Sequence, residues 1–357
     1  MQERQGIVEA PGRVNLIGEH IDYHRLPVLP MALERRVRID FRVRSDRRIC
    51  ACSEGYQNRE FEWSNALTPV AAGDWENYLR AAARAVAEKW GVGVGVDAEI
   101  HSDLPPAAGL SSSSALIVAA TLALLRANGI EASFEELMEV LPEGEHFVGT
   151  RGGGMDHAAS LASRAGCASL IAFQPVSIRH IPIPEGWSFL VAHSGVTAEK
   201  SGAVRERYNA RRKAGSTALA HFGVASYLEI PDGDVAAMAQ SLKTVEEHDA
   251  FLHTMSEALR VRHAVQAMER GEAEWFGRLL VESHASLRDR LHVSCAALDH
   301  LVDAAMASGA LGARLTGAGF GGCVVVFCRE EDSERVRSGL AGFPSVWPVK
   351  AGRGALA

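Results

Sequence analysis

Residues 10–23 read Ala-Pro-Gly-Arg-Val-Asn-Leu-Ile-Gly-Glu-His-Ile-Asp-Tyr and concentrate ionisable groups in a short stretch. Arg13, Glu19, His20 and Asp22 fall among glycines and apolar residues. A solvated charged face has no need of glycines, and a core strand has no need of ionisable groups. We therefore expect a rigid turn that presents polar groups to a small polar ligand.

A second segment with the right residue types for chemistry runs from Leu104 to Ser114. Two prolines and Gly109 predict a loop, and four serines then open an apolar helix that extends to Asn128. Backbone N–H groups at a helix N-terminus favour a phosphate, and serine hydroxyls bind phosphate or Mg²⁺. The alternative is a serine that caps an ordinary core helix. No Gly-Lys-Ser/Thr follows the glycine, so this is not a Walker A loop.

Asp156 follows three glycines, Gly152–Gly154, that allow the backbone to pass close to a ligand and to aim the carboxylate. The carboxylate is a candidate general base or metal ligand. The alternative is an aspartate in an ordinary Asx turn.

Residues 317–322 match the pattern G-x-G-x-x-G. The glycines precede a predicted strand, Val324–Phe327, instead of opening a helix after one, so a dinucleotide-binding fold is not indicated. Two interpretations stay open: a turn whose backbone approaches a ligand or another loop, and a tight β-turn without function.

A metal site offers a competing interpretation of the first segment. His20, Asp22 and His24 would share one face of a strand and would then suggest a metallohydrolase. Pro27 and Pro30 follow directly, and no distant cluster of histidines or cysteines completes the site. We therefore do not favour this alternative.

Composition sets limits on the class of protein. The 357 residues, 47% of them hydrophobic, suffice for two domains or one large α/β unit. The net charge of −7 argues against broad binding to nucleic acid or anionic membranes. The N-terminus shows no apolar signal-peptide core, and the longest apolar run, Ala115–Leu125, is too short to cross a bilayer. Six scattered cysteines favour reduced thiols in a cytoplasmic protein.

Hydrophobic periodicity predicts the elements that must position these residues. Predicted helices cover Trp75–Trp90, Ser111–Asn128, Phe134–Val140, Glu199–His221 and Asp332–Leu340, with several more before Gly309. Predicted strands cover Val37–Val43, Val96–Ile100, Cys167–Phe173, Ile178–Ile183, Trp187–His193, Gly312–Leu315, Cys323–Cys328 and Val346–Val349. Proline and glycine punctuation places a domain break near Pro182–Gly186.

At these motifs the chain resembles the GHMP small-molecule kinases, and within them the galactokinase family. Ala10–Tyr23 looks like the galactokinase signature, and Pro105–Ser113 looks like the Pro-x-x-x-Gly-Leu-x-Ser-Ser phosphate loop. Gly312–Cys323 looks like the C-terminal glycine-rich motif. The three motifs occur in the family's order, and the similarity between them covers most of the chain.

The resemblance implies roles for the residues that match. Arg13 and Asp156 would flank the anomeric hydroxyl of a sugar, with Asp156 accepting its proton and Arg13 stabilising the developing negative charge. Sugar hydroxyls would contact Glu19, His20, Asp22, the Gly153 backbone and Tyr208. The ATP phosphates would lie at Gly109, Leu110, Ser111, Ser112 and Ser113, with Ser113 on Mg²⁺ and adenine near Trp75 and Tyr78.

Several positions depart from the family pattern. Ile21 stands where threonine is usual, and the turn after the signature is His24-Arg25-Leu26 instead of an Asn-Gly-Gly type. The family's magnesium-binding glutamate corresponds to Gly144, so Mg²⁺ binding would fall to Glu143 or Glu145 on either side. The altered turn leaves room for a changed sugar preference.

The resemblance predicts an α/β protein of the α+β type, with the two-lobed GHMP kinase architecture and the active site in the cleft between the lobes. The N-terminal lobe would span residues 1–183 and the C-terminal lobe residues 184–357. The predicted reaction transfers phosphate from ATP to the anomeric hydroxyl of galactose, giving galactose 1-phosphate.

Two alternatives to this reaction stay open: another GHMP sugar 1-kinase, acting on an N-acetylated, deoxy or acid sugar, and a non-catalytic regulator that binds sugar and ATP. We expect a cytoplasmic monomer whose partner is galactose or a related monosaccharide, without nucleic-acid or membrane partners.

Overall fold

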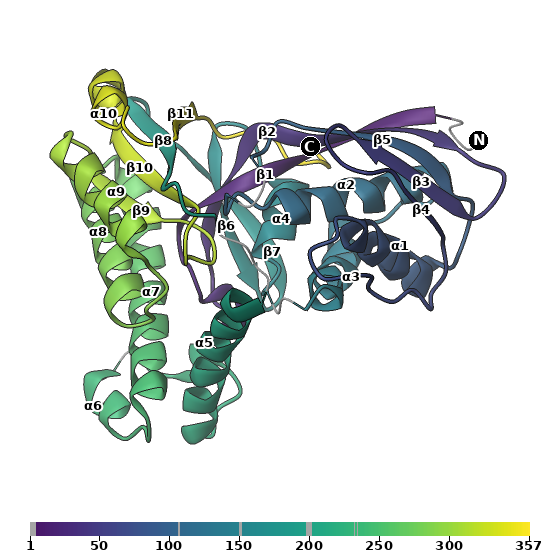
Figure 1. Ribbon diagram of the computed structural model, residues 1–357. Coiled ribbons are helices and arrows are strands. Elements are labelled where there is room, and N and C mark those ends of the chain that lie inside the picture. Colours follow the sequence, from purple (N-terminus) through teal and green to yellow (C-terminus); the bar gives the residue numbers. More distant parts are fainter. Residues whose placement is uncertain (1–4, 106–107, 150–151, 198–201, 232, 234) are drawn as a thin grey trace.

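A computed structural model describes residues 5–105, 108–149, 152–197, 202–231, 233 and 235–357 (Figure 1), and only the backbone of Glu145 and Ala203. The first sheet has the strand order β1 (Gln5–Ile17), β2 (Leu29–Val43), β5 (Val96–Ser102), β3 (Arg48–Ser53) and β4 (Arg59–Glu62). Strand β5 pairs in parallel with β3, and the other pairs are antiparallel.

This sheet has one buried and one exposed face. Along β5, Val96, Ala98 and Ile100 are buried, while Asp97 and Glu99 between them are exposed. Such alternation is typical of an antiparallel sheet whose outer face meets water. The inner face is covered by α1 (Glu76–Trp90), α2 (Ser112–Ala127), α3 (Phe134–Phe147) and α4 (Met155–Ala162) (Figure 1).

Helices α1 and α2 confirm the predicted helices at these positions, and α2 is buried on nearly all sides. Helix α3 is longer than predicted and continues to Phe147 despite Pro142. Its start is defined by a capping box, in which the Ser133 side chain accepts from the Glu136 N–H and the Glu136 carboxylate accepts from the Ser133 N–H.

The second lobe is built on an antiparallel sheet in the order β11 (Ser345–Val349), β8 (Trp187–His193), β10 (Cys323–Arg329) and β9 (Gly312–Leu315). Its helices are α5 (Gly202–His221), α6 (Val235–Gln240), α7 (Val245–Arg270), α8 (Ala273–Asp289), α9 (Ala296–Ala307) and α10 (Ser333–Gly339). The described residues also form short 3-10 helices: η1 (Asp22–His24) after β1, and η2 (Tyr227–Glu229) and η3 (Glu330–Asp332) in the second lobe. Helices α5, α6 and the start of α7 project from the body of the molecule (Figure 1).

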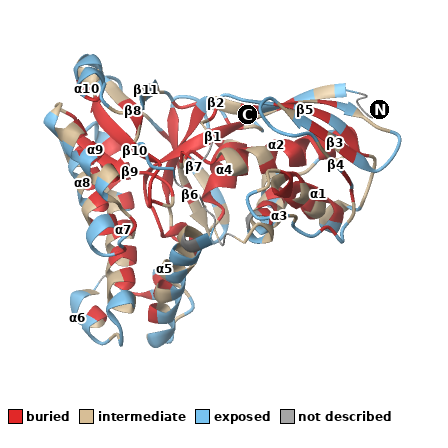
Figure 2. Ribbon diagram, viewed as in Figure 1, coloured by how far each residue is buried: buried red, intermediate tan, exposed pale blue. Residues whose placement is uncertain are grey.

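A hairpin of β6 (Cys167–Phe173) and β7 (Val176–Pro182) connects the two parts of the chain, and Ile171 pairs with Val28 beside β2. The expected boundary at residue 183 falls between β7 and β8. One apolar cluster nevertheless continues from β1 to Phe276 and Phe327 in the second lobe. Figure 2 shows buried residues along both β1 and β10. The division into residues 1–183 and 184–357 stays a prediction.

The interpretation of residues 10–23 as a turn is wrong for its first part. Residues 10–17 belong to β1 and pair with β2, with Arg13 opposite Ala32. The chain leaves the strand at Gly18, whose φ of 106° is accessible chiefly to glycine. A strand tolerates Arg13 at this place because a distant part of the chain supplies a partner for its charge, as described below.

The last residues of the chain return to the first lobe. The Gly352 N–H donates to the Ala32 carbonyl at 2.8 Å, and the Gly354 N–H donates to the Ser163 carbonyl at 2.7 Å. A Cβ atom on Gly354 would lie 2.3 Å from the Leu161 carbonyl oxygen, so this glycine is required by close backbone packing.

We therefore expect Gly354→Ala to lower the free energy of unfolding by about 1–3 kcal/mol, because backbone must shift to admit the methyl group. Gly342→Ala is the matched control, since nothing lies within 4 Å of a Cβ atom there. Chemical denaturation of both variants measures the effect, and equal stabilities would contradict the packing argument.

Candidate active site

A buried ion pair joins β1 to the start of α4. The Nε and Nη2 atoms of Arg13 lie 2.7 Å and 2.6 Å from Oδ1 of Asp156, which is 143 positions away in the sequence. Only 3% of Arg13 and 8% of Asp156 are exposed. Nη1 of Arg13 donates to the Gly109 carbonyl at 2.8 Å, so the guanidinium also holds the predicted phosphate loop. The structure brings the two predicted catalytic residues together.

The second carboxylate oxygen of Asp156 accepts hydrogen bonds from the serine segment. Oδ2 accepts the Ser111 hydroxyl at 2.5 Å and the Ser114 hydroxyl at 3.5 Å. Ser111 precedes α2 in the left-handed region, with φ of 59°, and its side chain makes no capping hydrogen bond. The first N–H groups of a helix have no acceptor within the helix. The N-terminus of α2, with Ser112 and half-buried Ser113 in its first turn, therefore suits an anionic ligand.

Glycines bring the phosphate loop close to two other segments. The Arg13 N–H donates to the Leu110 carbonyl at 3.1 Å, and a Cβ atom on Gly12 would lie 2.6 Å from that oxygen. A Cβ atom on Gly317 would lie 3.0 Å from the Gly109 carbonyl oxygen. The glycine-rich segment at residues 317–322 thus approaches the loop backbone, as one of its two sequence interpretations proposed.

The acidic residues after β1 point into a pocket between the lobes. Oε1 of Glu19 accepts the Gly317 N–H at 2.6 Å and lies 3.3 Å from the Thr316 hydroxyl. Oδ2 of Asp22 accepts the Gly153 N–H at 3.0 Å. The described pocket is lined by Arg13, Glu19, His20, Asp22, Gly152, Gly154, Met155, Asp156, Tyr208, Gly317 and Ala318.

His20 in this pocket is a neutral imidazole. Burial, reinforced by His253, lowers the pKa of His20 to about 3. Nε2 lies 3.2 Å from the Ala318 carbonyl, which only accepts, so Nε2 carries the proton. Nδ1 then accepts the Tyr23 hydroxyl at 3.1 Å. The ring of Tyr208, from α5, lies 5.3 Å from that of His20.

Side chains of helix α7 bind the backbone of the segment 18–20. The buried carboxylate of Glu257 accepts the Gly18 N–H at 2.9 Å and the Ser283 hydroxyl at 2.7 Å, and it pairs with Arg260 at 2.7 Å. Burial by itself would raise the pKa of Glu257, but Arg260 and His253 outweigh it and lower this pKa to about 2. Nε2 of His253 lies 3.0 Å from the Glu19 carbonyl. The second lobe thus fixes the backbone that carries Glu19 and His20.

A fully buried arginine on β9 completes the arrangement. Nη1 of Arg314 donates to the carbonyls of Asn15 and Leu16 at 3.0 Å each, and Nη2 lies 3.7 Å from Oε1 of Glu19. Burial lowers the pKa of Arg314, but a guanidinium in a protein stays protonated. Sequence reasoning missed Arg314, His253 and Glu257. The one available signal was a charged residue within the short, otherwise small and apolar strand Gly-Ala-Arg-Leu.

The predicted adenine pair and metal ligands lie outside this pocket lining. Trp75 and Tyr78 stand at the start of α1, where the Trp75 ring lies 6.1 Å from that of Tyr56. The exposed carboxylate of Glu143 lies 3.0 Å from Nδ1 of His146. The side chain of Glu145 is outside the described residues.

The strand geometry assumed for a metal site at His20, Asp22 and His24 is not observed. Among the described residues, no group of three or more His, Cys, Asp or Glu side chains has the geometry to hold a metal ion. His20, Asp22 and His24 do not lie on a strand, because residues 22–24 form the 3-10 helix η1. Both ring nitrogens of His20 already have protein partners.

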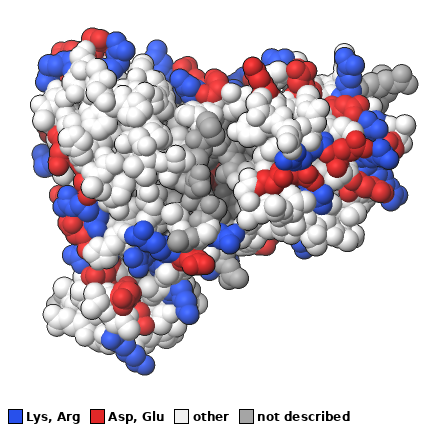
Figure 3. All heavy atoms as spheres, in the orientation of Figure 1, with Lys and Arg blue, Asp and Glu red and all other residues white. Residues whose placement is uncertain are grey.

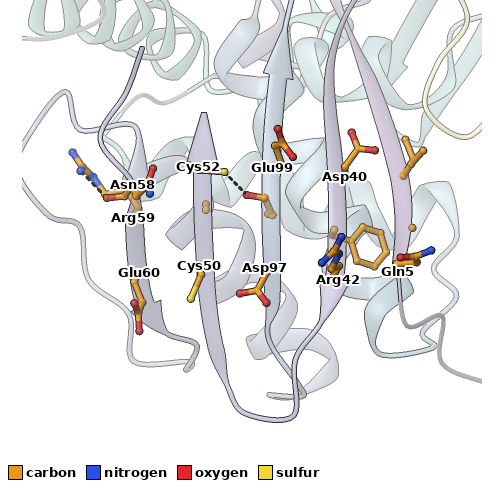
Figure 4. A pocket seen from close by; sticks show the side chains of 15 residues that line it. Gln5, Asp40, Arg42, Cys50, Cys52, Asn58, Arg59, Glu60, Asp97 and Glu99 are labelled. Atoms are coloured by element: carbon orange, nitrogen blue, oxygen red, sulfur yellow. Dashed lines mark hydrogen bonds between the residues drawn. The ribbon is translucent and has the colours of Figure 1, made fainter. Parts of the chain in front are cut away.

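A broad hollow on the outer face of the first sheet is a different surface (Figure 4). Its charged side chains pair with neighbours on the sheet, such as Arg44 with Asp97 and Arg48 with Glu60, each at 2.6 Å. Acidic and basic side chains are interspersed over this lobe in Figure 3. None of the described residues that line the hollow is a predicted site residue.

Comparison with known families and proteins shows which proteins this chain resembles. Family models match the galactokinase galactose-binding signature at residues 1–42, the GHMP kinases N terminal domain at residues 77–164 and the GHMP kinases C terminal domain at residues 264–344. A galactokinase of Chloroflexus aggregans is 36% identical over 354 residues, covering 97% of this chain and 89% of that protein. A galactokinase of Streptomyces coelicolor is 36% identical over 330 residues, covering 91% and 84%. The chain belongs to the galactokinase family of GHMP kinases.

Solved structures show the same fold. Lactococcus lactis galactokinase complexed with galactose superposes with a TM-score of 0.91 and 24% identity, covering 99% of this chain and 95% of that chain. L. major mevalonate kinase in complex with R-mevalonate gives a TM-score of 0.69 at 19% identity, covering 99% and 100%. The predicted fold class and the recognition of the galactokinase family are confirmed. In the described part of the chain, no helix is long and apolar enough to cross a membrane.

The buried histidines of this galactokinase-family site make its stability depend on pH. Burial lowers the pKa of His253 to about 4 from an ordinary value of 6.5, so between these pH values the unfolded chain binds a proton that the folded chain does not. His253 therefore lowers the free energy of unfolding as the pH falls from 6.5 towards 4, by at most about 1.4 kcal/mol per pH unit. Above pH 6.5 its contribution is constant.

Urea unfolding of wild type and His253→Gln between about pH 7.5 and pH 4.5 measures this slope. We expect a shallower slope for His253→Gln, because glutamine does not titrate. His101→Gln is the control, since that histidine is exposed on the first sheet. Identical slopes for wild type and His253→Gln would refute this assignment.

Proposed function

We propose that this protein transfers the γ-phosphoryl group of ATP to the anomeric hydroxyl of α-D-galactose, giving galactose 1-phosphate and ADP. The observation that carries the proposal is the buried Arg13–Asp156 pair, which meets the open N-terminus of α2 on one side and the polar pocket on the other. The relatives that cover nearly the whole chain are named galactokinases, and the similar structure at TM-score 0.91 is complexed with galactose.

Asp156 acts as the proton acceptor for the sugar hydroxyl. Phosphoryl transfer depends mainly on alignment and on neutralising charge, and a positioned base adds a smaller factor. Oδ1 of Asp156 is held by Arg13, which favours the carboxylate form and stabilises negative charge that develops on the sugar oxygen. Oδ2 accepts a hydrogen bond from the Ser111 hydroxyl. The proposed proton acceptor therefore contacts the loop that is proposed to bind the phosphates.

The residues at the start of α2 are suited to bind the phosphates of a nucleoside triphosphate together with Mg²⁺. Ser111 leaves the helix N-terminus uncapped, and the N–H groups there bind the phosphates together with the backbone of Gly109 and Leu110. Mg²⁺ in proteins is usually held by substrate phosphates and few protein groups, which matches the Ser113 hydroxyl with Glu143 or Glu145. When bound, Mg²⁺ neutralises phosphate charge. Trp75 and Tyr78 contact the adenine.

The sugar is recognised by Glu19, His20 and Asp22 from the loop after β1, with the Gly153 backbone and Tyr208. The carboxylates accept from sugar hydroxyls, and the protein contacts already described fix their positions. On this proposal the protein is a cytoplasmic monomer, without nucleic-acid or membrane partners.

We expect Asp156→Asn to reduce kcat by about 10²–10⁴-fold, because asparagine cannot accept the proton. ATP binding, measured by calorimetry, should be nearly unchanged, because the N-terminus of α2 remains. Asp40→Asn, on the outer face of the first sheet, is the matched control. Near-normal turnover of Asp156→Asn would refute the assignment of the base.

A panel of sugars with coupled ADP detection tests the substrate. We expect the highest kcat/KM for galactose over its N-acetylated, 2-deoxy, acid and glucose counterparts, because the predicted sugar contacts all line the pocket or contact residues that line it. A higher value for another sugar would overturn galactose as the substrate. Sugar binding without ADP release from any sugar would instead support the regulator.

A further inference from the structure

Helix α5 meets the loop after β1 at two places on one face. Tyr208 and Gly215 are seven residues apart on α5 (Gly202–His221), which is about two helical turns and places both on the same side of the helix. Tyr208 contacts His20, and Gly215 contacts His24. The position of Tyr208 in the pocket therefore depends on the distance between the backbone of α5 and the loop after β1.

Gly215 sets that distance. A Cβ atom on this buried glycine would lie 2.2 Å from Nε2 and 2.8 Å from Cε1 of His24. Glycine within a helix costs about 1 kcal/mol relative to alanine, so a glycine there needs a packing reason. The reason at this position is the imidazole of His24, which occupies the space that a methyl group would need.

The His24 ring cannot easily move aside. It meets the Tyr23 ring edge-on at a centroid distance of 4.7 Å and the Tyr227 ring at 5.0 Å. The Tyr227 hydroxyl donates to the Gly215 carbonyl at 2.6 Å, so the ring that packs on His24 is itself fixed to α5. His24 is thus held between two aromatic rings and the backbone of α5.

Tyr23 connects His24 to the residues of the pocket. Tyr23, which packs on His24, meets the Tyr208 ring at 5.7 Å and an interplanar angle of 88°. The hydroxyl of Tyr23 also reaches Nδ1 of His20 at 3.1 Å. A shift of α5 against His24 would therefore move Tyr208 relative to His20 in the pocket.

We propose that His24 and Gly215 form a complementary pair that positions Tyr208 over the sugar pocket and thereby sets the affinity for the sugar. His24 belongs to the turn His24-Arg25-Leu26, which departs from the family pattern. Both are positioning residues, since they act through Tyr23 and Tyr208. The proposal rests on the proposed function, because it concerns the sugar pocket of the same site.

A double-mutant cycle of Gly215→Ala and His24→Ala tests this coupling. We expect Gly215→Ala alone to raise KM for galactose by about 5-fold or more, with KM for ATP unchanged, because the displaced contact lies on the sugar side. In the His24→Ala background the same substitution should change KM for galactose by less than about 2-fold, because the clash is gone.

Thermal unfolding of the four proteins gives a readout that needs no substrate. Gly215→Ala should lower Tm in the wild type and raise it in the His24→Ala background, where only the gain in helix propensity remains. Ser216→Ala, on the exposed side of α5, is the control for propensity and should not affect KM for galactose. If Gly215→Ala alone does not fold, the double variant still should, and a double variant that also fails would refute the pairing.

Additive effects on KM and on Tm in an active wild type would overturn the inference while leaving the proposed function intact. A wild type that phosphorylates no sugar would instead refute the proposed function, and the sign change in Tm would still report on the pair. Equal increases in KM for ATP and galactose after Gly215→Ala would assign the glycine a merely structural role.

Discussion

The ion pair between Arg13 and Asp156 is the interaction on which the rest of the site depends. Both groups are nearly excluded from water, and removing one partner of a buried pair typically costs about 3–5 kcal/mol because the other charge is left uncompensated. The same guanidinium binds the Gly109 carbonyl, and the same carboxylate binds Ser111. Strand β1, the phosphate loop and helix α4 are therefore held by one pair of charges at the place where phosphate transfer is proposed.

The second lobe supports the proposed sugar-binding side of the site by a separate set of buried charges. Glu257, on α7, takes the Gly18 N–H, and Arg314, on β9, takes the carbonyls at the end of β1. These contacts add hydrogen-bond partners to buried backbone groups at the point where the strand ends. The polar loop 18–24 is held by contacts from both lobes, which places the residues proposed to bind the sugar in the pocket between them.

Much of the fold could be predicted from the sequence because local patterns encode it. The apolar run after Ser114 predicts a buried helix, and the alternation around Ile39 predicts a half-buried strand, as observed in α2 and β2. The motifs were sufficient to recognise the galactokinase family. The strand nature of residues 10–17 could not be predicted, because a charge at Arg13 looks unfavourable in a strand until its distant partner is known.

The sequence by itself determined most of the helices and strands, the family and the residue types available for catalysis, but not helix α4 or the full length of α3. The tertiary structure alone decided which polar groups meet: Ser111 turns to Asp156 instead of capping its helix, and Glu257 takes the Gly18 amide. It also decided that Gly215 makes room for His24. The physical reason is that helical and strand periodicity act over a few residues, whereas a buried charge or a close backbone approach is stabilised by partners far away in the chain.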